Sequence, residues 1–338
     1  MQESTRYVSI QVGIGGWQPM SAEEVANTGY GDCKALANYT LALLKHVGIR
    51  SLYTVVRADK YPRDIKEDFV SNQANHVFLC VPMEEDTIWL ECTSQTSPFG
   101  YIGNFTDDRK VMLITEKGGK IVRSKGYGKD QNRQATKATV TIKDGKSCIV
   151  DVKTVYSGLQ YDNISGRLHD SHEDNQRWLY NNLGLSNFKI LSFDFRSIPD
   201  QPVAIAHQEL ELASYLSGSG SRVFVPLNMF NSTSYVPRRE PGRKRDVVIR
   251  YPFTDIDSIR YVIPEGYTIE SIPSDSEIVT PFGEYRMNIK AEGNEVLYIR
   301  ERKMNRGTFP PESYDQLREF FNEISRSDRA KLVLLKGN

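Results

Sequence analysis

Three residues in the first hundred positions, Cys33, His76 and Glu91, have the types and the order of a thiol active site. Cys33 directly follows Asp32, and an aspartate commonly begins a helix by accepting a hydrogen bond from a backbone N–H. A thiol at the first helical position faces unpaired N–H groups and the positive end of the helix dipole, which favour the reactive thiolate. The same N–H groups can stabilise an oxyanion. Cys33 could therefore attack a carbonyl carbon, although a packed, inert cysteine is the simpler alternative.

His76 and Glu91 lie on two expected neighbouring strands, 75–81 and 87–92, which an acidic turn at 84–86 connects. Antiparallel neighbours lie about 5 Å apart, so a carboxylate there can reach the second ring nitrogen of the histidine. It would fix the imidazole tautomer and stabilise the imidazolium. Each residue alone has an ordinary structural explanation, and the order of thiol, imidazole and acid is what favours a triad.

Two helices and a small sheet are expected to position these side chains. A capping box at 21–24 begins the first helix and Gly29 ends it, while the second helix runs from Asp32 to Gly48. Apolar residues recur at helical spacing in the second helix and predict one buried face. These residues are Leu36, Tyr39, Leu43 and Val47. Further strands are expected at 51–57, 111–115 and 120–123.

The later part of the chain changes to a mainly β pattern. A polar, glycine-bearing stretch at 126–135 reads as a linker, and short strands then dominate, apart from an expected helix at 159–183 and a closing helix after Pro310. The sequence therefore predicts an α+β protein with a mainly antiparallel β region and a C-terminal helix. The expected domains are 1–125, 130–250 and 251–338, the last two being β-rich.

Three segments resemble the core motifs of bacterial transglutaminase-like domains, which have a papain-like cysteine fold. They are YGDCK at 30–34, NHV at 75–77 and WLECTS at 89–94, in the order and spacing of that family. Residues 6–19 resemble the segment before the nucleophile, so the resemblance covers about residues 5–125. From about 130, PEGY at 264–267 and PFGEY at 281–285 are similar to the β-rich C-terminal region of secreted bacterial members.

The resemblance implies roles for particular residues. Cys33 matches the nucleophile, His76 the base, and Glu91 the position where the family usually has an aspartate, so the acid is longer by one methylene. Trp17, Gln18 and Asp32 are candidates for substrate or oxyanion contacts, and a core position is the alternative for Trp17.

The implied activity is hydrolysis or transfer at amide bonds of a peptide, protein or cell-wall substrate. The resemblance also implies a periplasmic or extracellular location. Members often begin with a signal peptide and another β domain. Neither is recognisable before residue 5, so we expect that residues upstream are missing.

Composition argues against several other classes of protein. Lys+Arg and Asp+Glu both count 43, which gives no reason to expect nucleic acid as a partner. No apolar run reaches the roughly 20 residues that span a bilayer, and the four cysteines are too few for a disulfide scaffold. Cys80 and Cys148 are expected to be buried, and a disulfide between Cys80 and Cys92 is an alternative that spacing alone does not decide.

No cofactor or metal is expected. The glycines at 13–16 lack the context of a nucleotide loop, and His169 and His172 lack a third nearby metal ligand. The basic residues between 238 and 245 are expected to form a solvated loop.

Two alternatives to an enzyme stay open. In the first, the triad is inactive and the β-rich region binds a glycan or another protein. In the second, the chain is a structural or assembly protein of the cell envelope.

Overall fold

The computed structural model describes residues 1–10, 13–60 and 63–337. In it the chain separates into two compact units. Unit 1 comprises Met1–Tyr127 with Pro199–Pro202, and unit 2 comprises Gly128–Ile198 with Val203 onwards. Helices and strands are mixed, strands predominate, and a helix lies near the C-terminus, which confirms the predicted α+β class.

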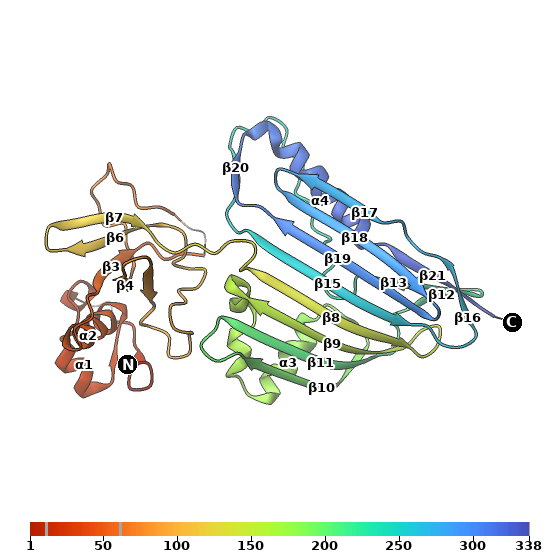
Figure 1. Cartoon of the computed structure of the whole chain (residues 1–338), viewed down its shortest axis with the longest axis horizontal. Helices are drawn as coiled ribbons and strands as arrows, with labels where there is room; N and C mark the ends of the chain where they lie inside the picture. Colours follow the sequence, from red (N-terminus) through yellow and green to blue (C-terminus); the bar gives the residue numbers. More distant parts are fainter. Residues whose placement is uncertain (11–12, 61–62, 338) are drawn as a thin grey trace. The chain divides into compact units, whose positions relative to one another are not determined.

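Unit 1 places two helices against a small antiparallel sheet. Its described residues form a five-stranded sheet in the order β5-β4-β3-β6-β7 (Figure 1). Val25 of α1 and Leu36 of α2 share a buried cluster with Val77 and Leu79 of β4, so the helices cover this sheet through β4. The bounds are β1 (Arg6–Tyr7), η1 (Gly13–Gly16), α1 (Ala22–Thr28), β2 (Tyr30–Gly31), α2 (Cys33–His46), β3 (Leu52–Val56), β4 (His76–Pro82), β5 (Thr87–Leu90), β6 (Lys110–Thr115) and β7 (Gly118–Arg123).

The helix ends follow the predicted caps, but the predicted buried face of α2 is right only in part, since Leu36 is buried and Tyr39 packs against the same cluster whereas Leu43 and Val47 are exposed. Ser21 caps α1 by accepting from the N–H of Glu24, and Gly29 ends it in a left-handed conformation. Leu43 of α2 is 40% exposed, and Val47, the residue directly after α2, is 65% exposed. The face that packs against α1 and β4 runs through Cys33, Leu36 and Ala37, and the partly buried Leu41 and Leu44 continue it.

Unit 2 is built on one large sheet, and residues 128–337 are described without a gap. The strand order is β10-β11-β9-β8-β15-β19-β18-β17 (Figure 1). Neighbouring strands are antiparallel except β8 and β15, which pair in parallel. The bounds are β8 (Arg133–Ile142), β9 (Cys148–Ser157), β10 (Phe188–Ser197), β11 (Val203–Leu212), β15 (Phe253–Val262), β17 (Ser276–Thr280), β18 (Gly283–Glu292) and β19 (Glu295–Met304).

Smaller elements complete unit 2. A four-stranded sheet has the order β12-β13-β21-β16, β14 pairs with β20, and two helices contribute to the core. The bounds are η2 (Gly158–Asn163), η3 (Ser165–Leu168), α3 (His172–Asn182), β12 (Ser217–Ser219), β13 (Arg222–Pro226), β14 (Val247–Ile249), β16 (Tyr267–Ser271), β20 (Gly307–Phe309), η4 (Pro311–Ser313), α4 (Tyr314–Asp328) and β21 (Lys331–Lys336). The helix predicted at 159–183 is therefore two short 3-10 turns followed by α3.

The predicted division at 250/251 falls inside unit 2. The strands β8–β11 come from the first predicted β-rich domain and β15–β19 from the second. The parallel pairing of β8 with β15, with Ala138 opposite Ile259, joins them into one sheet. Because this pairing links residues far apart in the sequence, no local pattern could indicate it.

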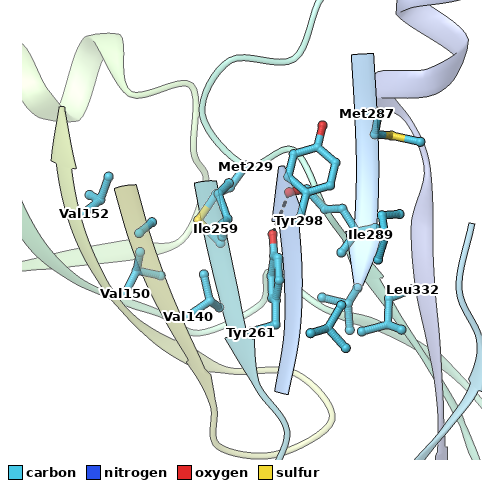
Figure 2. Packing of buried hydrophobic residues seen from close by; sticks show 14 of the residues in the cluster. Val140, Val150, Val152, Met229, Ile259, Tyr261, Met287, Ile289, Tyr298 and Leu332 are labelled. Carbon is cyan, nitrogen blue, oxygen red and sulfur yellow. Dashed lines mark hydrogen bonds between the residues drawn. The ribbon is translucent and has the colours of Figure 1, made fainter. Parts of the chain in front are cut away.

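One hydrophobic core spans both halves of this sheet. Val152, Ala138, Ile259, Tyr298 and Ile289 lie opposite one another on five successive strands. Figure 2 shows four of these side chains, all but Ala138, on the same side of the sheet. Leucines from α3, α4 and β21 belong to the same cluster, so the two helices and the smaller sheet share this core.

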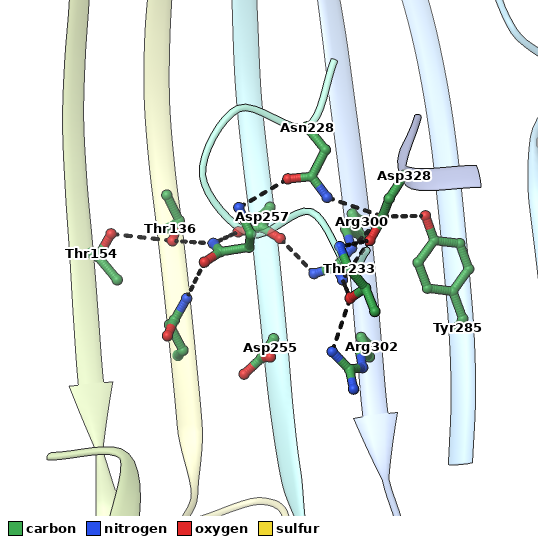
Figure 3. Close-up of polar contacts among 12 residues, drawn as sticks. Thr136, Thr154, Asn228, Thr233, Asp255, Asp257, Tyr285, Arg300, Arg302 and Asp328 are labelled. Atoms are coloured by element: carbon green, nitrogen blue, oxygen red, sulfur yellow. Dashed lines mark hydrogen bonds and ion pairs between the residues drawn. The ribbon is translucent and has the colours of Figure 1, made fainter. Parts of the chain in front are cut away.

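A buried polar network lies within the same unit (Figure 3). Arg300 is fully buried and donates through Nε and Nη2 to Asp328, at 2.9 and 3.1 Å, and through Nη1 to Asp257, at 2.9 Å. Other donors to Asp328 are Asn228, Thr233 and Tyr285. Asp328 is the last residue of α4, so the network fastens this helix end to β19, β18 and the segment after β13.

Candidate active site

Cys33 is the first residue of α2, and the cap of this helix shapes its surroundings. Asp32 accepts a hydrogen bond from the N–H of Ala35 at 3.0 Å through Oδ1, and its carbonyl accepts from Leu36 at 2.9 Å. Asp32 also forms an ion pair with Lys34. The cap thus uses the N–H of Ala35 and not those of Cys33 and Lys34, which lie at the positive end of α2.

The backbone before Cys33 is tightly packed. Tyr7 of β1 lies opposite Gly31 of β2, and the N–H of Val8 donates to the carbonyl of Gly31 at 2.9 Å. A Cβ added to Gly31 would lie 2.7 Å from the Cβ of Ala35. Residue 31 must therefore lack a side chain for the start of α2 to lie where it does.

His76 begins β4, and contacts on two sides fix its ring. Its Nε2 lies 2.9 Å from Oε2 of Glu91, and the ring of Phe105 packs at a centroid distance of 5.3 Å. Burial alone would lower the pKa of the imidazole, but hydrogen bonds with Cys33 and Glu91 and the charge of Glu91 raise it to about 9. Because Nε2 faces Glu91, Nδ1 is the ring nitrogen that remains for Cys33.

Glu91 follows the last residue of β5 and is held at both carboxylate oxygens. Oε2 faces His76, and Oε1 accepts from the backbone N–H of Thr93 at 3.0 Å and from its hydroxyl at 2.6 Å. Burial opposes ionisation of Glu91, but the hydrogen bonds with His76 and Thr93 outweigh it, so the pKa of this carboxyl lies below its ordinary value. The carboxylate is therefore ionised at neutral pH, and the side chain of Glu91 is 3% exposed.

The structure brings Cys33, His76 and Glu91 together, and we call these residues the thiol cluster. Cys33 is 5% exposed and the side chain of His76 is 11% exposed, so the cluster lies under the surface. Trp17, in contrast, is 73% exposed, which contradicts the alternative of a core tryptophan. Gln18 is exposed as well, and the roles of both in substrate binding stay predictions.

Residue types and spacing did not identify three further residues around the cluster. The side chain of Asn75 binds both the N–H and the carbonyl of Ala58, at 2.7 and 2.9 Å, and so fixes the chain just before His76. Phe105 comes from a distant loop and had no sequence signal. Thr93 did have a signal, because a threonine two residues after a strand-ending acid can donate back to it.

The other candidate sites have ordinary structural explanations. The four cysteines, all in the described part of the chain, are free thiols, so Cys80 and Cys92 are not bridged. Cys80 and Cys148 are buried, as predicted. His172 stacks on Phe193 at 4.3 Å between ring centroids. Over residues 1–10, 13–60 and 63–337, no group of three or more acidic, histidine or cysteine side chains is arranged to hold a metal ion.

None of the helices in the described ranges is both long enough and apolar enough to cross a membrane.

Comparisons with known proteins concern mainly the fold. The model of one family, a domain of unknown function with a solved structure (DUF3858), matches residues 221–334. The crystal structure of a putative protease from Parabacteroides distasonis is similar to 98% of this chain, with a TM-score of 0.52 and 14% sequence identity. The similar region is 49% of that protein, so this chain spans about half its length. No curated protein matches the sequence.

Proposed function

We propose that this chain is a transglutaminase-like thiol enzyme that hydrolyses or transfers amide bonds of a peptide, protein or cell-wall substrate. The observation that carries the proposal is the position of His76. One ring nitrogen lies 2.9 Å from a buried carboxylate, and Cys33, at the start of a helix, is close enough to the imidazole to raise its pKa. This is the relation between nucleophile, base and orienting acid that acyl transfer requires.

In the proposed first step, the sulfur of Cys33 bonds to the carbonyl carbon of the substrate. The oxyanion that forms lies near the N–H groups of Cys33 and Lys34 at the start of α2. The carbon–nitrogen bond then breaks, and the Nδ1 proton of His76 passes to the leaving amine. Glu91 stabilises the imidazolium before this transfer.

In the second step, water or an amine attacks the acyl carbon and gives a proton to Nδ1 of His76. The carbon–sulfur bond breaks and Cys33 leaves as a thiolate, which restores the starting state. Neither step uses a metal or a cofactor.

Two findings support this substrate class. The motifs at 30–34, 75–77 and 89–94 resemble those of a thiol acyltransferase family, and the chain shares its fold with a putative protease. Because the resemblance is to secreted proteins, we propose that the substrate is met outside the cytoplasm.

Labelling with iodoacetamide tests whether Cys33 is activated. We expect Cys33 to react near pH 6 at least about tenfold faster than a free model thiol. The other thiols should stay silent, because burial raises the pKa of Cys92 and of Cys148 to about 12. Mass spectrometry locates the label, and Cys33→Ser is the control. Labelling of Cys33 only above pH 8, at the rate of the model thiol, would refute the proposed enzyme.

The burial of Cys33 favours a second candidate function. At 5% exposure, the thiol is reached only if a surface segment moves, and an inactive cluster in a binding module needs no such movement. In this alternative, unit 2 binds a glycan or protein of the cell envelope. The whole chain and its Cys33→Ser variant would then bind cell-wall material equally, and Cys33 would resist iodoacetamide until the protein is denatured.

A further inference from the structure

The acid of the thiol cluster is held more firmly than a hydrogen bond to His76 alone would hold it. A glutamate has one more rotatable bond than an aspartate, and fixing such a side chain carries an entropic penalty. In a thiol active site, misplacing a catalytic group by about an ångström reduces the rate up to about a hundredfold. A glutamate in this position therefore needs an additional restraint.

Thr93 supplies that restraint through two donors on the same oxygen. Its hydroxyl lies 2.6 Å and its backbone nitrogen 3.0 Å from Oε1 of Glu91, which leaves Oε2 directed at His76. Three hydrogen bonds thus fix the carboxylate of a side chain that is 3% exposed. Short hydrogen bonds to an ionised, buried acceptor are among the stronger ones in proteins.

The loop that carries Thr93 is itself anchored. The amide of Gln2 donates to the carbonyls of Ser94 and Ser97, each at 3.0 Å, and the amide of Gln95 donates to the carbonyl of Thr5 at 2.7 Å. The segment that carries Thr5 continues into β1, which pairs with β2 just before Cys33. The loop that carries Thr93 is therefore held by hydrogen bonds on its C-terminal side.

We propose that Thr93 is a positioning residue, whose hydroxyl aligns Glu91 with His76 and so lets a glutamate serve where related domains use an aspartate. This inference rests on the proposed function, since alignment of the acid matters only if His76 acts on Cys33. The consequence for charge follows directly. When Glu91 is misaligned, the imidazolium loses part of its stabilisation and His76 loses its proton at a lower pH.

Other ionisable groups near the thiol cluster belong to neighbouring elements, and a substitution at Thr93 leaves their residues unchanged. Cys33 and Asp32 lie at the start of α2, where Lys34 pairs with Asp32. Tyr53 of β3 lies close enough that the charges of Cys33 and Asp32 add to the effect of burial and raise its pKa. A substitution at Thr93 alters none of these groups directly.

The test compares Thr93→Val with Thr93→Ser and with the control Thr96→Val. Valine has the shape of threonine but lacks the hydroxyl donor, serine keeps the donor, and Thr96 is an exposed residue of the same loop. Two readouts are measured from pH 5 to 10. The first is the rate at which iodoacetate labels Cys33. A decline of this rate at high pH reports that His76 has lost its imidazolium proton. The second is the pKa of His76 from imidazole NMR signals.

We expect Thr93→Val to lower the pKa of His76 by at least about half a unit. At pH 9 this lowers the fraction of imidazolium, and with it the labelling rate, by about twofold or more. Thr93→Ser should leave the His76 pKa and the labelling rate close to those of the native protein, and Thr96→Val should match the native protein. A His76 pKa that is unchanged in Thr93→Val would overturn the proposal. Equal losses in the valine and serine variants would overturn it too, because packing of the methyl group would then be responsible.

The two readouts separate this inference from the proposed function. If native Cys33 labels no faster than a model thiol, the enzyme proposal fails, and the His76 titration still decides whether Thr93 aligns Glu91. If native Cys33 labels fast and the titration does not respond to Thr93→Val, the enzyme proposal stands and the role of Thr93 fails.

Discussion

Replacing Glu91 by glutamine should make the stability of unit 1 depend less on pH. The amide can still accept from Thr93, but the group facing Nε2 of His76 becomes an N–H donor, which favours the neutral imidazole. In the native protein the pKa of His76 is raised from 6.5 to about 9. A shift of this size corresponds to at most about 3 kcal/mol of stability, shared between Cys33 and Glu91. We expect Glu91→Gln to remove about 1–2 kcal/mol of it.

The sign of the effect follows from the direction of the shift. Because the pKa of His76 is higher in the folded than in the unfolded protein, its contribution is complete below pH 6.5 and is lost as the pH rises through 9. Glu91 is ionised in both states above about pH 5, since its pKa is lowered on folding. The difference in unfolding free energy between the native protein and Glu91→Gln should therefore be largest near pH 6 and smallest near pH 10.

Urea unfolding at a series of pH values measures this difference. Trp89 lies in unit 1, buried and stacked on Phe78 at 5.2 Å, so its fluorescence follows the unit that contains the thiol cluster. The same substitution in a His76→Gln background provides the control and should show no pH dependence. An effect of Glu91→Gln that is equal at pH 6 and pH 10 would refute the ion pair on which the proposed mechanism depends.

Two further substitutions test the packing around the site and the core of unit 2. Gly31→Ala should destabilise unit 1 by about 1–3 kcal/mol in urea unfolding, because its Cβ would meet that of Ala35 at 2.7 Å. The control is Gly166→Ala, where no described atom lies within 4 Å of the added Cβ. This control should be near neutral. Arg300→Leu leaves the buried carboxylate of Asp328 without its cation and should destabilise unit 2 by about 3–5 kcal/mol in thermal unfolding; a loss under 1 kcal/mol would show that the network contributes little.

Local signals predicted most of unit 1. The capping box at 21–24, the aspartate before Cys33 and the strand pattern at 75–81 each depend on neighbouring residues, and the structure has the expected helices and strands. The predicted buried face of α2 holds for Leu36 and fails for Leu43 and Val47, which have helical spacing but are exposed. Periodicity shows that a face exists, whereas burial also requires a second element against it.

The arrangement of unit 2 could be predicted only in part. Hairpins such as β8–β9 and β18–β19 have short turns and alternating residues, which agrees with the short strands that the sequence predicts for this region. The pairing of β8 with β15 and the meeting of Arg300 with Asp328 join residues that are distant along the chain. For the same reason Phe105, which packs on His76 from another loop, could not be identified.

The parallel pairing of β8 with β15 has a consequence for synthesis of the protein. Roughly 110 residues separate the end of β8 from the start of β15, which at about 5–20 residues per second takes the ribosome roughly 6 to 20 seconds. During that interval the hairpin of β8 and β9 can form while one edge of β8 has no neighbour, and such an edge readily recruits strands of other chains. Coexpression with a chaperone that binds nascent chains should therefore raise the soluble yield of the protein.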